Sequence, residues 1–384
     1  MPDEPIPFGR PQLDADEIEA VTRVLSGHTL VHGPVTAKFE KAFAARVGAE
    51  HAISVSSCTA GLQLSLLANK VGPGDEVLVP AMTHVATAHA VEWCGAKPVF
   101  VDVDPGSGNI ATSGVKAALG SDTRAVLVVH YLGLPCDMDA IRTASDAAGC
   151  PVIEDCALAV DALYGDRVAG TLGSTGCFSF YPVKHMTTIE GGMVTTNDDA
   201  LAATIRQRRA FGYDQMLGQR RVTGVYDVTE LGHNFRMNEV EAAVGLAQMA
   251  KLDAFQAARK ANFDRLRAAL ADVEEVTVFE PVQGKAVSSH YCLNAILPED
   301  GRVDRSRVLD RLKEAGIGFS VHYPVAVPLT TYYRKRYGFS PGKFPVAEWI
   351  ASQSISLPVG PHVRPKDIDR IAEQLHDAIR HARS

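Results

Sequence analysis

The stretch "CFSFYPVKHMTTIEGGMVTTND", Cys177 to Asp198, combines the alternation of a strand with a single lysine and a Gly-Gly pair. Its lysine, Lys184, stands between a proline and a histidine. A buried, unpaired ammonium is costly and its pKa falls, so a lysine in such a place needs either a charged partner or a chemical role. A lysine that forms a Schiff base has this requirement. On this segment alone, a surface lysine in a loop after a strand explains the pattern as well.

The bulk composition indicates a globular protein. The chain has 384 residues, of which 46% are hydrophobic and 22% charged, enough for a large core and about two domains. A net charge of -7 and a pI near 6.0 give no electrostatic footprint for nucleic acid or for an anionic membrane. We therefore expect neither as a partner, and anionic substrates would need local basic groups.

The seven cysteines are scattered, with no C-x-x-C pair and no histidine at zinc-like spacing. We expect neither a disulfide scaffold nor a metal site. The acidic start, "MPDEPIPFGRPQLDADE", lacks an apolar signal core, and no apolar run approaches the roughly 20 residues that span a bilayer. These features predict a cytoplasmic location.

Short apolar runs alternate with helical patterns between residues 50 and 200. Several runs are apolar at consecutive positions, as in strands that helices cover on both faces. The pattern predicts an α/β domain with a largely parallel sheet, and helices near 60–70, 84–95 and 138–148. The predicted strands are "HAISVSS", "DEVLVPA", "KPVFVDVD", "RAVLVVHYL", "PVIEDCA", "CFSFYP" and "GGMVTTND".

The second half predicts a smaller α/β domain. Residues 237–272 have apolar residues at helical spacing and no proline, so they form one long helix or two in line. The runs "AILP", "IGFSVHYP" and "SISLP" follow, with helices at 305–315 and 365–381. We expect a large domain over 1–255, with an N-terminal segment able to pack on the small domain, and a small domain over 256–384.

The segment "ISVSSCTAGLQLSLL" has the form of a phosphate site, a strand that enters a small-residue turn and opens a helix. Backbone N–H groups of the first helical turn, together with the helix dipole, can hold a dianion there. Ser57, Cys58 and Thr59 are the candidates. An ordinary helix N-cap explains the same residues.

Two further strand ends carry polar groups. "PVIEDCALA" places Glu154 and Asp155 at the carboxyl end of a buried strand, where ligands of open α/β sheets bind. One carboxylate there can serve a cationic ring nitrogen, although a helix N-cap for 156–163 is the alternative. "VPAMTHVATAHA" places His84 after another strand, where its ring can stack on a flat heteroaromatic ring. A core or capping histidine is the alternative.

Together these segments resemble the fold-type I pyridoxal phosphate enzymes, and most closely the sugar aminotransferases named for DegT, DnrJ, EryC1 and StrS. The resemblance covers nearly the whole chain, with its motifs in the family's order and spacing. It implies an α/β fold with a mostly parallel mixed sheet in the large domain and a smaller C-terminal α/β domain. The motifs that carry it are "IPFGRPQLDADEIEAV", "GPVTAKFEKAFAARVGAEHAISVSSCTAGLQLSL", "CGAKPVFVDVDP", "LGHNFRMNEVEAAVGLAQM" and "LPVGP".

The resemblance implies roles for individual residues. Lys184 matches the lysine that forms the internal aldimine and later moves the proton between Cα and C4′. Asp155 matches the carboxylate that keeps the pyridine nitrogen protonated, which makes the ring an electron sink. His84 matches the stacking aromatic residue. Ser179 matches a hydroxyl that binds the cofactor phosphate together with the 57–59 turn.

Other matches concern the partner subunit and the substrate. Asn234 matches a residue that reaches the phosphate of the neighbouring subunit, which implies a homodimer with shared active sites. His322 and Tyr323 match a position that lines the sugar pocket. The arginines of "IRQRRAFGYDQMLGQRR" could meet a diphosphate or could form a solvated face. Leu158 departs from the pattern, because relatives often have Gln, His or Glu there, near the cofactor's 3-oxygen.

The implied function is transfer of an amino group from an amino acid, with L-glutamate as the expected donor, to a keto sugar, most often nucleotide-linked. Pyridoxal 5′-phosphate (PLP) is the cofactor and pyridoxamine 5′-phosphate (PMP) its intermediate form. One alternative is an aminotransferase for a cyclitol or an unlinked keto sugar. Another is a regulatory PLP-binding protein without turnover, against which Lys184, Asp155 and Ser179 argue together. Because Lys184 is present, the chain does not match the family's dehydratases, in which histidine replaces lysine.

Overall fold

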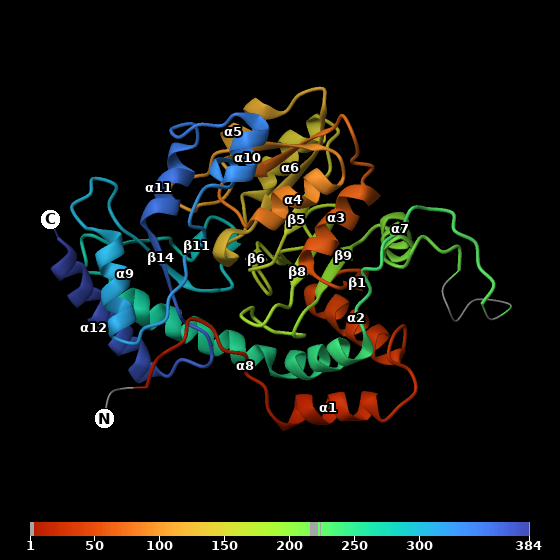
Figure 1. The fold of residues 1–384 in the computed structure, drawn as a ribbon, viewed down its shortest axis with the longest axis horizontal. Helices are drawn as coiled ribbons and strands as arrows, with labels where there is room; N and C mark the ends of the chain where they lie inside the picture. The colour runs from red at the N-terminus through yellow and green to blue at the C-terminus, as the bar shows by residue number, and fades with distance from the viewer. Residues whose placement is uncertain (1–3, 216–221, 223, 384) are drawn as a thin grey trace.

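The computed structural model describes residues 4–215, 222 and 224–383. Figure 1 shows two α/β parts connected by the long helix α8 (Glu239–Ala269), which runs beneath the sheet of the larger part and reaches into the smaller one. The helix begins at a capping box, in which Asn238 accepts from the N–H of Glu241 and the Glu241 carboxylate accepts from the N–H of Asn238. The region 237–272 therefore forms one helix, the first of the two predicted possibilities.

A seven-stranded sheet forms the centre of the large part, in the order β1-β9-β8-β5-β4-β2-β3. The strands from β3 to β8 are parallel, and β9 is antiparallel to both of its neighbours. The predicted strands and the mostly parallel sheet are thus confirmed. The strands are β1 (His51–Val55), β2 (Glu76–Pro80), β3 (Lys97–Val101), β4 (Thr123–Val129), β5 (Val152–Asp155), β8 (Thr175–Ser179) and β9 (Gly192–Thr196).

Helices flank this sheet, because the strands are apolar on consecutive positions and need cover on both faces. The three helices predicted in this region are α3, α4 and α6. The helices of the large part are α1 (Ala15–Leu25), α2 (Pro34–Val47), α3 (Cys58–Ala68), α4 (Val85–Trp93), α5 (Thr112–Ala118), α6 (Met138–Ala147) and α7 (Asp199–Arg209), with a 3₁₀ turn η1 (Tyr131–Gly133).

The small part contains a three-stranded sheet in the order β10-β13-β14. The predicted strand over "IGFSVHYP" is wrong as a continuous strand. In the structure, Ile317 makes an isolated bridge with Ile6, and Ser320 makes one with Ser356. The elements of this part are β10 (Thr277–Val278), β13 (Leu293–Ile296), α9 (Arg305–Glu314), β14 (Ser354–Leu357) and α12 (Pro365–Ala382). The intervening η3 (Val327–Leu329), α10 (Thr331–Tyr337) and α11 (Pro345–Gln353) pack instead on the core of the large part.

The two parts are not separated at a single position of the chain. Strand β12 (Ala286–Val287) pairs with β11 (Val282–Gln283) and also with β6 (Leu163–Tyr164) of the large part, which pairs with β7 (Arg167–Val168). Ile6 lies in the apolar core of the small part. The division near residue 255 stays a prediction.

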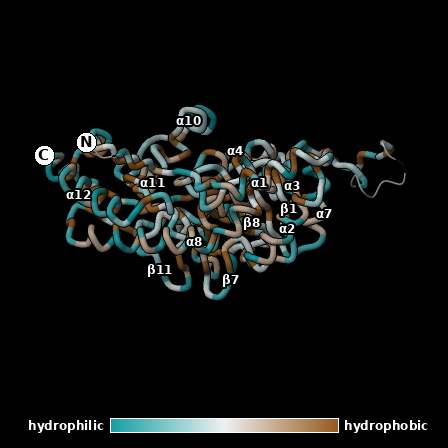
Figure 2. The backbone as a smooth tube through the Cα atoms, turned by 90° about the horizontal axis from the view of Figure 1, so that it is seen from below, coloured by the Kyte–Doolittle hydropathy of each residue, from teal (hydrophilic) through white to brown (hydrophobic). Residues whose placement is uncertain are grey.

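The hydrophobic segments concentrate inside the body, as the brown stretches of Figure 2 show. The described segments on either side of residues 216–221, between α7 and α8, extend away from the body in both views. Within the described residues, none of the helices combines the length and the apolar character that a membrane crossing needs.

Candidate active site

A cavity of about 410 Å³ lies at the carboxyl ends of the parallel strands, where open α/β sheets bind their ligands. It brings together segments from both parts of the chain. Asn234 is the predicted site residue that does not line it. The predicted residues in its wall are Ser57, Cys58, Thr59, His84, Asp155, Leu158, Ser179, Lys184, His322 and Tyr323.

Lys184 enters the cavity from the turn that follows β8. Its backbone N–H donates to the carbonyl of Tyr181 at 2.9 Å, and its Nζ lies 5.3 Å from the ring centroid of Tyr291. No carboxylate of the described residues forms an ion pair with it. Burial lowers the pKa of Lys184, and the opposing effect of Asp155 is smaller. The side chain therefore has the depressed pKa that a nucleophilic amine needs.

Asp155, at the end of β5, is held by neutral donors. Its Oδ2 accepts a 2.9 Å hydrogen bond from Oγ1 of Thr87, and its Oδ1 accepts from the N–H of Ala157 at 3.1 Å. The hydroxyls of Thr87 and Thr83 lie 2.7 Å apart. Since Thr87 donates to the carboxylate, Thr83 donates to Thr87. Oδ1 also accepts from the thiol of Cys58 at 3.9 Å. Oδ2, with one donor, keeps acceptor capacity for an N–H group from the cavity.

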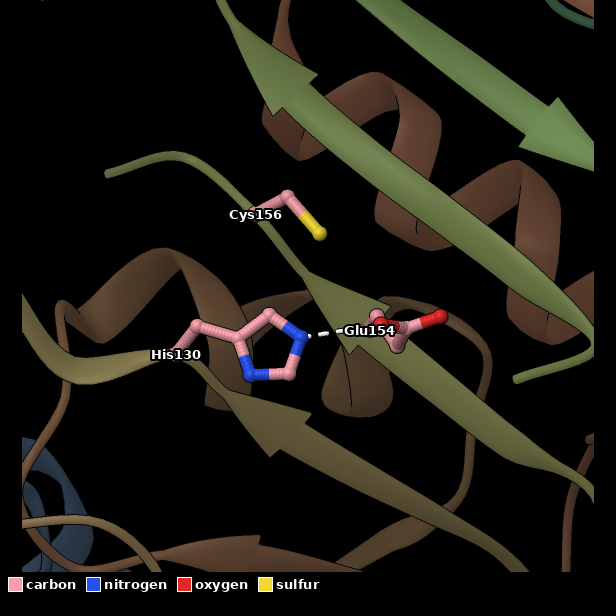
Figure 3. A group of neighbouring side chains, drawn as sticks. All are labelled: His130, Glu154 and Cys156. Atoms are coloured by element: carbon pink, nitrogen blue, oxygen red, sulfur yellow. Dashed lines mark hydrogen bonds and ion pairs between the residues drawn. The ribbon is translucent and has the colours of Figure 1, made fainter. Parts of the chain in front are cut away.

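Glu154, the neighbouring carboxylate, is engaged on the other face of β5, because successive side chains of a strand point to opposite faces. Figure 3 shows the imidazole of His130 directed at it, with the thiol of Cys156 nearby. Its oxygens accept from Nε2 of His130 at 2.9 Å and from three backbone amides within 170–173 at 2.6–2.8 Å. Burial raises the pKa of Glu154, but these hydrogen bonds outweigh it and the pKa is lowered. With four donors on its two oxygens, this carboxylate holds structure and offers no lone pair to a metal ion.

The turn at the start of α3 forms the helix N-cap and also borders the cavity. Ser57 is the N-cap, and its hydroxyl accepts from the N–H of Ala60 at 3.1 Å. The first N–H groups of the helix, those of Cys58 and Thr59, have no partner within the helix and border the cavity. A Cβ on Gly192 would lie 2.6 Å from the N of Cys58, so only glycine lets β9 approach this turn. The turn is therefore both an N-cap and a potential anion site.

His84 likewise combines two roles. It is the N-cap of α4, where its Nδ1 accepts from the N–H of Ala86 at 3.2 Å, and its ring lines the cavity. Burial and then the charge of Lys184 lower the pKa of His84, so the ring is neutral near pH 7. The ring of Tyr323 meets it edge-on, with centroids 5.8 Å apart. A neutral, fixed ring is suited to stacking.

His322 and Tyr323 also line the cavity. His322 Nδ1 lies 2.9 Å from Oγ of Ser356, which donates to Oδ1 of Asn294 at 3.0 Å. Burial lowers the pKa of His322 to about 3, so the imidazole is neutral. Burial also raises the pKa of Tyr323, which keeps its phenol protonated.

Several wall residues were not predicted from the sequence. Tyr181, Glu190 and Tyr291 border the cavity, and Thr83 and Thr87 support Asp155. The two threonines flank His84 at an i, i+4 spacing that places both on one side of a helix start, so the sequence contained this signal. Tyr291 comes from a distant loop, for which the sequence has no local signal.

Asn234 lies outside the cavity wall in a single chain. Its backbone forms an isolated bridge with Ala210, and the carbonyl of the next residue, Phe235, accepts from the N–H of Ser56 at 2.8 Å. The segment thus passes beside the phosphate-type turn. Its predicted role in a neighbouring subunit stays a prediction.

The arginines predicted to meet a diphosphate are mostly engaged elsewhere. Arg209 is buried and donates to Glu40 at 2.7 Å, and Arg208 donates to Glu230 at 2.6 Å. These two hold the fold. Arg206 is partly exposed, and positions 220 and 221 lie outside the described residues.

The cavity fits PLP in its donor set. Lys184 supplies an amine of lowered pKa without an ion-pair partner, Asp155 offers free acceptor capacity to a ring N–H, and the start of α3 offers unpaired amides to a phosphate. Leu158, 2% exposed, supplies no polar group to the wall. A mostly parallel α/β sheet with these groups at its carboxyl edge defines a fold-type I PLP-dependent enzyme.

The sequence profile described as the DegT/DnrJ/EryC1/StrS aminotransferase family matches residues 11–376, and the chain belongs to this family. It is 37% identical over 382 residues to the spore coat polysaccharide biosynthesis protein SpsC of Bacillus subtilis (strain 168), which covers 98% of each chain. The aminotransferase TlmJ from Streptoalloteichus hindustanus has a similar structure, with a TM-score of 0.90, 32% identity and coverage of 98% of this chain and 99% of TlmJ.

A third relative links the fold to the cofactor. Spr1654 of Streptococcus pneumoniae has solved PLP and PMP forms. Its PMP form matches with a TM-score of 0.92 and 25% identity, covering 98% of this chain and 100% of that one. The predicted family, enzyme class and cofactor are confirmed, and the protein is a PLP-dependent aminotransferase.

Proposed function

We propose that the protein transfers an amino group from an amino acid, with L-glutamate as the donor, to the keto group of a nucleotide-linked sugar. The polysaccharide role in the name of SpsC supports a sugar acceptor. When bound, PLP supplies an electron sink that stabilises negative charge at the donor's α-carbon. The residues of the chain bind, orient and move protons around it.

Lys184 holds the cofactor and then acts as the base. Its lowered pKa makes the neutral amine available, and the proton it takes from the donor's α-carbon is the one it later returns. Asp155, oriented by the hydroxyl of Thr87 and the N–H of Ala157, would accept the hydrogen bond of the protonated ring nitrogen. The amides at the start of α3, with Ser179, hold the phosphate. His322 and Tyr323, both neutral, face the acceptor side of the cavity.

The single observation that supports this function most is that Lys184 and Asp155 border one cavity with the start of α3. Borohydride treatment of the loaded protein should fix the cofactor to Lys184, as peptide mapping would show. Lys184→Ala should bind PMP without turnover. A label on another lysine, or no label, would contradict the assignment.

The acceptor is tested with 15N-labelled glutamate and a panel of keto sugars, with and without a nucleotide, and nitrogen transfer is read by mass spectrometry. We expect transfer to nucleotide-linked keto sugars. Transfer to a free keto sugar or a cyclitol instead would refute the nucleotide linkage and leave the aminotransferase assignment intact.

We also propose a homodimer with shared active sites. Large apolar side chains beside the cavity and along the segment between α7 and α8 are exposed in the single chain, among them Tyr181 (48%), Ile189 (54%) and Leu231 (83%). A second copy of the chain would cover these side chains, since exposed apolar surface is a mark of protein interaction sites. Asn234 follows in the same segment and is the residue expected to enter the partner's site.

Mixing two inactive variants tests the shared site. Lys184→Ala and Asn234→Ala chains, each inactive alone, should regain activity together, because hybrid dimers contain one site with both residues intact. Ultracentrifugation shows whether dimers form. Mixed dimers without activity would mean that Asn234 does not serve the neighbouring site.

A further inference from the structure

Arg259, in the middle of α8, is a buried guanidinium whose hydrogen-bond partners are all backbone carbonyls. It is 6% exposed. Its Nη2 donates to the carbonyl of Lys184 at 3.2 Å, and its Nη1 donates to the carbonyl of Tyr291 at 3.0 Å. Nε has no hydrogen-bond partner. Burial lowers the pKa of Arg259 to about 10, so it stays protonated near pH 7.

A buried arginine without a counter-charge destabilises the fold. No carboxylate among the described residues pairs with Arg259, whereas the equally buried Arg209 has Glu40 at 2.7 Å. Taking a charge out of water costs several kcal/mol unless a counter-charge and hydrogen bonds compensate it. A long apolar side chain would fill the same space without this penalty. The contacts of the guanidinium should therefore explain why a charged residue stands at this position.

Its two carbonyl partners are cavity residues that come from different parts of the chain. Lys184 follows β8 of the large part, and Tyr291 precedes β13 of the small part. The Nζ of Lys184 lies 5.3 Å from the Tyr291 ring centroid, so the two side chains meet inside the cavity. A second link runs beside the first, since Nε2 of His185 lies 3.0 Å from the carbonyl of Ser289.

We propose that Arg259 is a positioning residue, which fixes the backbone of Lys184 against that of Tyr291 and so aims the Lys184 amine. The planar fork of a guanidinium can hold two carbonyls at a set separation, which a lysine ammonium cannot do with the same geometry. This inference rests on the proposed role of Lys184. Arg259 itself touches neither substrate nor cofactor.

Arg305 offers a matched control. Its Nη1 donates to two backbone carbonyls, those of Ala351 at 2.9 Å and Ser354 at 3.2 Å, and it lies in the small part away from the cavity. Burial lowers the pKa of Arg305 as well. Arg305→Met therefore removes the same kind of contact without a link to Lys184.

The test compares Arg259→Met, Arg259→Lys and Arg305→Met with the unchanged protein. Stopped-flow absorbance measures how fast apo-protein captures PLP, and steady-state kinetics with α-deuterated glutamate measures the proton step. We expect Arg259→Met to slow capture and to lower kcat by about 10- to 100-fold, the loss typical of a misplacement near 1 Å, with KM within about twofold. The deuterium isotope effect should rise. Arg259→Lys should recover part of each loss, and Arg305→Met should lower only the melting temperature.

Capture and isotope effects in Arg259→Met like those of the unchanged protein would overturn the proposal. The proposal would also be overturned if Arg305→Met lost as much PLP capture and kcat as Arg259→Met at an equal fall in melting temperature. The losses would then come from reduced overall stability. If Arg259→Met does not fold, the same measurements of PLP capture and isotope effect on Arg259→Lys test the proposal. If the unchanged protein does not capture PLP, the proposed role of Lys184 is refuted. If the unchanged protein captures PLP and the Arg259 variants do so equally fast, only the positioning role of Arg259 is refuted.

Discussion

Oγ1 of Thr87 donates a 2.9 Å hydrogen bond to Oδ2 of Asp155, and both side chains are buried, with Asp155 in the wall of the cavity. The bond connects helix α4, which carries the ring of His84 at its N-cap, to strand β5. The stacking residue and the carboxylate are therefore fixed relative to each other. Thr83, which donates to Thr87, extends the chain of hydroxyls.

Removal of this bond should weaken catalysis without unfolding the protein. Thr87→Val keeps the shape of the side chain and deletes the donor, and a hydrogen bond to a charged group contributes about 1.5–3 kcal/mol. We expect kcat to fall about tenfold or more and the PLP dissociation constant, measured by fluorescence, to rise. Thr87→Ser, which keeps the hydroxyl, should stay near the unchanged protein. Equal kcat values and equal PLP dissociation constants in the Val and Ser variants would show that this hydrogen bond does not contribute to function.

The burial of Lys184 makes the stability of the apo-protein depend on pH. Its pKa in the folded state is lowered from 10.5, so between that lowered pKa and 10.5 the unfolded chain binds more protons and stability rises with pH. Lys184→Met removes the buried charge and should raise the free energy of unfolding near pH 7 by on the order of 1–3 kcal/mol.

The gain in Lys184→Met should shrink as the pH approaches 10.5, which urea unfolding at a series of pH values would show. The control is Lys285→Met, because the exposed Lys285 pairs with Asp139 at 2.6 Å and lacks this burial. A gain that stays constant with pH would mean that the effect comes from packing rather than charge.

The sheet was predictable from the sequence because its strands are buried on both faces and read as consecutive apolar residues. The segment "IGFSVHYP" has a similar apolar content, yet its bridges go to two different elements, one at Ile6 and one at Ser356. A continuous strand needs one partner over several residues. Pairing between positions so far apart in the chain leaves no local pattern, so the error could not be seen in the sequence.

The site was predictable where a local motif carried it. Lys184 and the 57–59 turn stand in short segments of recognisable form, whereas Tyr291 reaches the cavity through tertiary folding alone. Glu154 and Asp155 were equal candidates from residue type. Strand alternation separates them only once the cavity's face of β5 is known. The structure resolves this, because Glu154 has four donors on the far face.

Ile189, beside the cavity residue Glu190, has a backbone φ of 76°, in the left-handed region. A β-branched residue is strained there, by about 1–2 kcal/mol, and its side chain is 54% exposed. Ile189→Gly relieves this strain, although the greater freedom of glycine in the unfolded chain takes back about 0.5–1 kcal/mol. We expect a net gain of about 0.5–1 kcal/mol in urea unfolding at fixed protein concentration, from the difference of these terms.

Ile189→Val keeps the β-branch and should show no such gain. If Ile189→Gly unfolds more easily than the unchanged protein, the isoleucine side chain contributes more through contacts than its backbone strain costs. A loss that appears only at protein concentrations where dimers form would assign those contacts to the partner subunit.

Leu158 lines the cavity, and the family resemblance predicts a polar side chain near the cofactor's 3-oxygen at this position, to which a leucine would offer no hydrogen bond. In the loaded protein the charge on the 3-oxygen then lacks one donor, and such a donor contributes about 1.5–3 kcal/mol, or about one to two pKa units. Leu158→Gln should therefore lower the pKa of the bound chromophore, provided that its amide reaches the oxygen. Leu158→Met, which keeps the volume without a donor, should leave the pKa unchanged. Spectrophotometric pH titration of the three proteins distinguishes a missing hydrogen bond from a packing role of Leu158. Coincident titration curves, or a higher pKa in Leu158→Gln, would show that water or another group already donates to the oxygen.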